Sequence, residues 1–100
     1  MILEVAVFKI KLDKISEFEA VFPKAAAISA STPGYISHEL RRCVETKGKY
    51  LYMLRWESIE AHMVNYAQSS RRAEFRKLIG DFWAEPPVAE HFEAVTDDRI

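Results

Sequence analysis

The sequence predicts an α+β fold, namely one ferredoxin-like βαββαβ domain over residues 1–100 with an antiparallel four-stranded sheet. Its apolar periodicities follow the order strand, helix, strand, strand, helix pair, strand, which is the split βαβ arrangement. A chain of 100 residues suffices for one core, and a content of 49% apolar and 29% charged residues is typical of a globular protein.

The first strand, expected over residues 2–11, is apolar on both faces. A strand with two apolar faces requires cover on both sides of the sheet. Helices cover only one face of a ferredoxin-like sheet, so we expect a second copy of the chain to cover the other, giving a homodimer. The two alternating sets are Leu3, Val5 and Val7 on one side and Ile2, Ala6, Phe8 and Ile10 on the other.

The helix expected next has apolar residues at intervals of three and four. Asp13 or Ser16 is in position to cap this helix, and Ser16 with Glu19 fits a capping box. Pro23 lies inside the apolar stripe and predicts a kink, or a helix in two parts, near Phe22. The stripe consists of Ile15, Phe18, Phe22, Ala25 and Ile28, and the stop signal Thr32-Pro33-Gly34 follows it.

Residues 35–44 and 49–57 read as two antiparallel strands joined by the turn 45–48, where Gly48 supplies a positive φ. Ser58 then caps a short helix. The inner face of that helix is expected to carry Ile59, His62, Met63 and Tyr66.

A further helix is expected to start at Ser69 or Ser70. Pro86 and Pro87 end this helix, because proline cannot continue it, and the last strand is expected over residues 88–95. The apolar stripe of the helix consists of Phe75, Leu78, Ile79, Phe82 and Trp83.

Composition excludes several classes of protein. A net charge of −1 argues against a nucleic-acid partner, which would need a surplus of Lys and Arg. No apolar run has the length of a membrane span, so no membrane partner is expected. The lone Cys43 has no internal disulfide partner, and the first residues lack a basic signal-peptide region. A cytoplasmic location is therefore expected.

Five short segments, taken in order, carry a family resemblance. They are Pro33-Gly34-Tyr35 before the second strand, Arg55-Trp56-Glu57-Ser58 at a strand end, Glu60-Ala61-His62, Ser69-Ser70 before Phe75, and the return strand 88–95. Over nearly the whole chain the sequence resembles the antibiotic biosynthesis monooxygenase superfamily, the dimeric α+β barrels. The resemblance implies cofactor-independent oxygenation of aromatic or quinol-like substrates in some members and haem breakdown in others.

Haem breakdown requires side chains that this sequence lacks. The resemblance implies an Asn late in the first strand, a Trp on the second helix and a His on the third. The counterparts here are Val7, Asn65 or Tyr66, and Phe75. Phe75 has no donor atom for iron. A haem-binding or haem-degrading protein is therefore the weakest reading, kept only because His62 offers a ligand elsewhere on the inner face.

Oxygenation without a cofactor requires an apolar aromatic cavity, a base for the phenolic proton and donors for the resulting anion. His62 is the expected base, because the ordinary pKa of histidine lies near 6.5. Trp56, Asn65 and Tyr66 complete the expected catalytic set. The residues expected to line the cavity and bind the substrate are Phe18, Phe22, Met63, Phe75, Phe82 and Trp83.

A metal centre is not expected, because no two of His38, His62 and His91 have a short ligand spacing. Glu4 lies on the first strand, which should neighbour the last strand, so a contact between Glu4 and His91 fits the order of the strands. Their register is not determined by the sequence. Basic residues at 41–42, 71–72 and 76–77 have acidic neighbours and read as solvated, paired surfaces.

Two functions from different classes remain. The first is a homodimeric, cofactor-independent monooxygenase acting on a small aromatic or quinol-type molecule. The second is a non-catalytic dimeric barrel that binds a small hydrophobic ligand. Every aromatic residue in the helix stripes also has a plain structural explanation, because an amphipathic helix needs such a stripe for its core.

Overall fold

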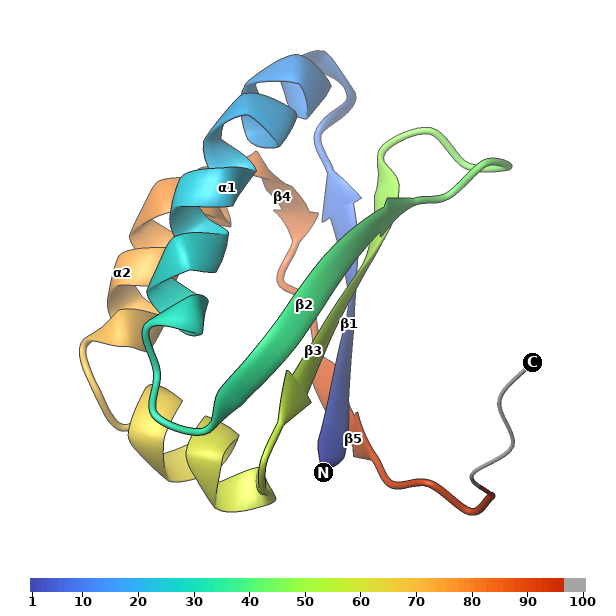
Figure 1. The fold of residues 1–100 in the computed structure, drawn as a ribbon. Helices are drawn as coiled ribbons and strands as arrows, with labels where there is room; N and C mark the ends of the chain where they lie inside the picture. The colour runs from blue at the N-terminus through green and yellow to red at the C-terminus, as the bar shows by residue number, and fades with distance from the viewer. Residues whose placement is uncertain (97–100) are drawn as a thin grey trace.

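The computed structural model describes residues 1–96, and its antiparallel sheet is covered on one face by helices (Figure 1). The strand order is β2-β3-β1-β4, and β5 also pairs with β1. This order confirms the predicted ferredoxin-like α+β fold. The strands are β1 (Ile2–Ile10), β2 (Tyr35–Arg42), β3 (Lys49–Trp56), β4 (Trp83–Glu85) and β5 (Ala89–Phe92). The helices are η1 (Leu12–Lys14), α1 (Ile15–Ala30), η2 (Ala61–Tyr66), α2 (Arg71–Ile79) and η3 (Gly80–Phe82).

The core lies between the sheet and the helices. Phe8 of β1 is opposite Tyr50 of β3, and Ala6 is opposite Tyr52, so these side chains share the helix-covered face. Phe18 and Phe22 of α1 pack onto that face. Phe18 meets Phe8 edge to face, with the ring centroids 6.1 Å apart. Aromatic pairs in this arrangement stabilise the layer beyond their simple burial.

Helix α1 corrects two expectations. It is continuous from Ile15 to Ala30 with Pro23 inside, so the predicted two-part helix is wrong. Pro23 is exposed, which leaves the carbonyl that loses its N–H partner on the water side of the helix. The capping box is also wrong, because Ser16 lies within the helix and Glu19 accepts hydrogen bonds from Arg42 and Tyr50 instead.

The strand expected over residues 88–95 forms as the shorter β5, Ala89–Phe92, and an additional strand, β4, precedes it. β4 and β5 both pair with β1, and residues 86–88 between them are not in a strand. Pro86 and Pro87 explain the gap, because neither has an N–H to give to the sheet. Trp83 was predicted at the end of a helix and instead begins β4, since α2 ends at Ile79.

The short helix after β3 forms as predicted, but with π-type hydrogen bonding. Ser58 Oγ accepts a hydrogen bond from the Ala61 N–H at 3.2 Å, which confirms its capping role. Its buried residues are Ala61, His62 and Tyr66. Ile59 and Met63 were also placed on the inner face, but they are 48% and 45% exposed.

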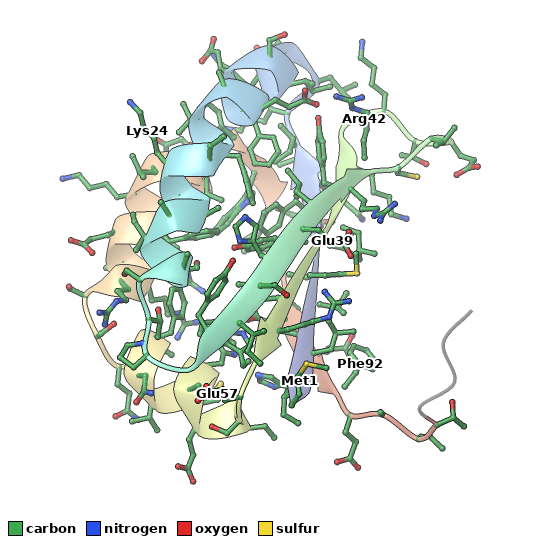
Figure 2. All side chains as sticks on the ribbon, viewed as in Figure 1. Met1, Lys24, Glu39, Arg42, Glu57 and Phe92 are labelled. Atoms are coloured by element: carbon green, nitrogen blue, oxygen red, sulfur yellow. The ribbon has the colours of Figure 1, made fainter. Side chains whose placement is uncertain are left out.

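No helix covers the other face of the sheet within residues 1–96, and α1 and α2 lie together on the opposite side (Figure 1). Phe92 lies on this uncovered face (Figure 2), where the register places it opposite Leu3. The apolar centre of the uncovered face comprises Leu3, Val5, Val7, Leu51, Met53 and Phe92. None of the helices in the described residues is long and apolar enough to cross a bilayer.

We predict that Gly34→Ala destabilises the fold. Gly34 has a φ of +94°, and a Cβ there would lie 2.5 Å from the Ala61 Cβ. The positive φ and the clash together should cost about 1–3 kcal/mol of unfolding free energy, measurable by urea denaturation. Gly80→Ala is the matched control, because its nearest neighbour would be 3.9 Å away. Equal stability losses in the two variants would contradict this account.

Candidate functional site

A cavity of about 520 Å³ lies between the sheet, η2 and α2. This volume falls within the usual range for a small-molecule site. The walls of the cavity come from the strands β1, β3, β4 and β5, from the helices α1, η2 and α2, and from the Pro87–Val88 linker. The lining residues are Glu4, Ala6, Phe8, Ser29, Tyr52, Leu54, Trp56, His62, Met63, Tyr66, Ala67, Arg72, Phe75, Arg76, Trp83, Pro87, Val88, Ala89 and His91.

A connected polar cluster occupies one side of this cavity. His62 Nδ1 and His91 Nε2 are hydrogen-bonded at 2.7 Å. His62 Nε2 lies 3.3 Å from Glu4 Oε1, and Trp56 Nε1 donates a hydrogen bond to the same oxygen at 2.9 Å. The four side chains therefore form one continuous contact chain from the buried indole to His91.

The sheet register brings this cluster together. Glu4 has the same side-chain phase as Ala6 and Phe8, so its carboxylate points to the helix-covered face. β1 and β5 pair so that Glu4 lies opposite His91, as the order of the strands suggested. From η2, His62 stacks on the Trp56 ring with centroids 5.4 Å apart and an interplanar angle of 23°.

Burial controls the charge of both central groups. It raises the pKa of Glu4, an effect opposed by the hydrogen bond from Trp56 and by the Arg72 charge. Burial, together with the neighbouring His91 and Arg72, lowers the pKa of His62 to about 4. His62 is therefore neutral at pH 7, with one ring nitrogen protonated and the other free to accept.

Two lining residues carry buried polar atoms without a hydrogen-bond partner among the described residues. They are the Tyr52 hydroxyl and the Trp83 indole nitrogen. Burial raises the pKa of Tyr52, and it raises the pKa of Tyr66 to about 12, so both phenols stay protonated at neutral pH. An unpaired buried donor is costly, and a ligand oxygen would remove that cost.

Arg72 and Arg76 line the cavity from α2. Neither guanidinium forms a salt bridge with a carboxylate within residues 1–96. The sequence suggested that these basic residues form solvated, paired surfaces, and for this pair the pairing is absent from the described part of the chain. Burial is the main cause of the raised pKa of Tyr66, and the charges of Arg72 and Arg76 partly oppose this rise, which indicates a positive potential at the cavity wall.

The structure brings together six of the ten residues predicted for the site. His62, Tyr66 and Trp56 line the cavity, as do Met63, Phe75 and Trp83. Asn65 does not, because its side chain is exposed and donates a hydrogen bond to the Pro33 carbonyl at 2.8 Å. The remaining three, which belong to or pack on the core outside this cavity, are Phe18, Phe22 and Phe82.

Glu4, His91, Arg72, Arg76 and Tyr52 were not among the residues predicted for the site. An acid in phase with the apolar residues of β1 is the one signal in the sequence that marks Glu4 as buried. His91 could be located only through the register of β5, which the sequence does not determine.

A second hollow, of about 710 Å³, lies between α1 and β2 and includes Phe22, Pro23 and His38 in its lining. Its polar rim is already paired, since Arg42 donates to Glu19 at 2.8 Å and Tyr50 donates to the same carboxylate. The 520 Å³ cavity, with its unpaired polar atoms, is therefore the candidate site.

Two of the positions that haem breakdown would require, Val7 and Phe75, carry side chains without a ligand atom. Val7 lies on the uncovered face of the sheet and not in the cavity. Phe75 lines the cavity but offers no ligand atom. Residues 1–96 contain no group of three or more His, Cys, Asp or Glu side chains arranged to hold a metal ion.

Comparison with known proteins identifies the class. The family model of the antibiotic biosynthesis monooxygenases matches residues 1–79. The chain therefore belongs to the antibiotic biosynthesis monooxygenase family. It is 38% identical over 95 residues to the uncharacterized protein YczJ of Bacillus subtilis (strain 168), covering 95% of this chain and 100% of YczJ.

Solved structures agree with this assignment. A Bordetella bronchiseptica protein assigned to the antibiotic biosynthesis monooxygenases has a TM-score of 0.89 and 32% identity, covering 95% of this chain and 97% of its own. SnoaB, a cofactor-independent oxygenase from Streptomyces nogalater, has a TM-score of 0.81 and 23% identity, covering 95% and 93%. At that identity the likeness to SnoaB shows the fold alone.

We predict that His62 makes stability depend on pH. Between pH 6.5 and about 4 the unfolded chain binds a proton at His62 that the folded chain does not, so stability falls as pH drops through this window. Between pH 7 and 4.5 the wild type should lose about 2–3 kcal/mol more unfolding free energy than His62→Gln. Glu4, whose raised pKa acts in the opposite sense, is present in both proteins.

Urea denaturation of both proteins at the two pH values measures this difference. The same loss of stability in the wild type and in His62→Gln would show that His62 does not resist protonation in the folded state.

Proposed function

We propose that this protein is a cofactor-independent monooxygenase that oxidises a small aromatic or quinol-type molecule in the 520 Å³ cavity. The observation that carries the proposal is the pairing of an aromatic cavity with a buried, neutral, hydrogen-bonded histidine. Membership of the antibiotic biosynthesis monooxygenase family and the likeness to SnoaB, a cofactor-independent oxygenase, support the same class of reaction.

In the proposed reaction the substrate itself supplies the electrons. A histidine takes the phenolic proton, and the electron-rich anion reduces dioxygen. The substrate loses two hydrogens and gains one oxygen atom, while the second oxygen leaves as water. The protein's part is to hold the anion, exclude water and move the proton.

Particular side chains fit each of these tasks. Tyr52 and Trp83 offer unpaired donors to a substrate oxygen. Arg72 and Arg76 provide positive charge that favours a phenolate over a phenol. Phe75 is stacked on Tyr52, with ring centroids 6.0 Å apart and an interplanar angle of 6°, and together they form a flat aromatic wall.

We predict that oxygen uptake with a panel of hydroquinones and hydroxyanthracenes depends on His62. His62→Ala should lower kcat by about 100-fold or more, the usual range for loss of a general base or its direct support. Val64→Ala is the matched control, because Val64 is on the same short helix, is 46% exposed and does not line the cavity. Equal rates in the wild type and in His62→Ala would remove the histidine from the mechanism.

The alternative function is ligand binding without catalysis. It is favoured by one observation, namely that both ring nitrogens of His62 already have partners and neither is free for a substrate. Tight binding of an aromatic panel compound with no oxygen uptake by the wild type would establish this alternative.

We also propose that the protein is a homodimer in which the uncovered sheet faces pack together. The apolar centre of that face is flanked by charges of both signs, including Glu39 with Arg41, a pair 2.9 Å apart, and Arg55. A face that carries both signs around an apolar centre can be complementary to a two-fold copy of itself.

We predict that Met53→Glu dissociates the dimer, because it places a charge at the centre of the apolar face. Analytical ultracentrifugation should show twice the 11.6 kDa chain mass for the wild type and the chain mass for the variant. Lys24→Glu on the exposed side of α1 is the control (Figure 2). A wild type that sediments at 11.6 kDa at high concentration would contradict the proposal.

A further inference from the structure

We infer that His91 is the residue that takes the substrate proton, and that His62 and Glu4 form a relay that stores this proton behind it. The inference rests on the proposed function. It moves the point of contact with the substrate from His62, on the short helix after β3, to His91 on the last strand.

The contact distances order the three groups in a line. Both ring nitrogens of His62 are engaged, Nδ1 with His91 Nε2 at 2.7 Å and Nε2 with Glu4 Oε1 at 3.3 Å. His62 therefore cannot accept a substrate proton directly without breaking one of these two contacts. His91 is half-buried and lines the cavity, and its Nδ1 takes part in none of the hydrogen bonds of the described residues.

The protonation states follow from these contacts. An ionised Glu4 favours a proton on His62 Nε2, which leaves Nδ1 of the neutral ring as an acceptor. His91 must then donate from Nε2 to His62 Nδ1, because a hydrogen bond needs one donor. In the neutral ring of His91 the remaining lone pair is on Nδ1, the atom left for the substrate.

Proton uptake reverses the direction of both hydrogen bonds that join His91, His62 and Glu4. The substrate O–H bond breaks and an N–H bond forms at His91 Nδ1. The Nε2 proton of His91 passes to His62 Nδ1, and the Nε2 proton of His62 passes to Glu4 Oε1, a step for which the 3.3 Å contact must shorten slightly. Both histidines end neutral, with their tautomers exchanged, and Glu4 ends as a carboxylic acid.

The surroundings favour this final state. Glu4 is buried, and burial raises its pKa, so this carboxylate accepts a proton more readily than an exposed one would. Arg72 and Arg76 of α2 line the same cavity, and the burial of His62 together with the charge of Arg72 disfavours an imidazolium on His62. The other titratable groups on the cavity wall are Tyr66 of η2 and Tyr52 of β3, both of which stay neutral at pH 7.

A purely structural role would not require this arrangement. Packing alone would be served by apolar side chains at positions 4, 62 and 91, since burying polar groups costs free energy. Trp56 Nε1 donates a hydrogen bond to Glu4 Oε1 at 2.9 Å, which keeps this oxygen beside His62. Glu4 and His62 are therefore positioning residues in this scheme, and His91 is the catalytic residue.

We predict that His91→Ala lowers kcat by about 100-fold with little change in KM, and that added imidazole restores much of the lost rate. Rescue by a diffusible base is the result that a structural role would not give. Glu90→Gln is the matched control, because Glu90 is next to His91 in the sequence but its side chain points to the uncovered face of the sheet. Loss of rate without rescue, or full activity in His91→Ala, would overturn the assignment of His91.

Glu4→Gln tests the proton store separately. It keeps the hydrogen bond from Trp56 but cannot accept a proton, so the acid limb of the pH-rate profile that reports the ionisation of Glu4 should be lost while KM stays near the wild-type value. An unchanged profile would overturn the role of Glu4.

Nuclear magnetic resonance of the 15N-labelled histidines in the wild type shows which ring nitrogens carry protons, and so tests the relay without a substrate. We expect the signal of a proton on Nε2 of both rings, with Nδ1 of His91 left as the acceptor, and His62 to remain neutral to about pH 4. A proton on Nδ1 of His91 at pH 7 would overturn the relay. Absence of oxygen uptake by the wild type with every compound would instead overturn the proposed function, so the two failures are distinguishable.

Discussion

The buried carboxylate of Glu4 on the central strand is the constraint on which the site depends. A carboxylate that is 7% exposed needs partners, and the fold supplies an indole N–H from β3 and an imidazole from η2. These two partners of Glu4, the Trp56 ring and the His62 ring, also stack on each other. The polar side of the cavity is therefore organised around one acid that the core would otherwise not tolerate.

The two faces of the sheet have different roles. The helix-covered face carries the aromatic core and the cavity, while the other face carries an apolar centre without a helix. This division explains why β1 is apolar in both of its alternating sets. It also places the proposed dimer contact and the candidate site on opposite sides of the same strands, so that a change at one face need not alter the other.

The sequence predicted the element order, the Ser58 cap, the Gly48 turn and the family, because each depends on local chemistry or on periodicity. It failed where tertiary packing overrode local preference. Pro23 is tolerated because it lies on the exposed side of α1, and the Glu19 side chain pairs with Arg42 instead of capping the start of the helix. Phe18 and Phe22 belong to the same aromatic class as the cavity residues, and only their positions on α1 relative to the sheet separate core from cavity.

The sequence alone determined most of the strands and helices and most of their apolar faces, with Trp83 and Met63 as exceptions, because side-chain periodicity is a property of the local chain. The meeting of Glu4, His62 and His91 was decided only by the tertiary structure. It depends on the pairing of β5 with β1, and a slip of one residue would turn His91 to the opposite face. Such a register is set by contacts between residues far apart in the chain, and no local pattern records it.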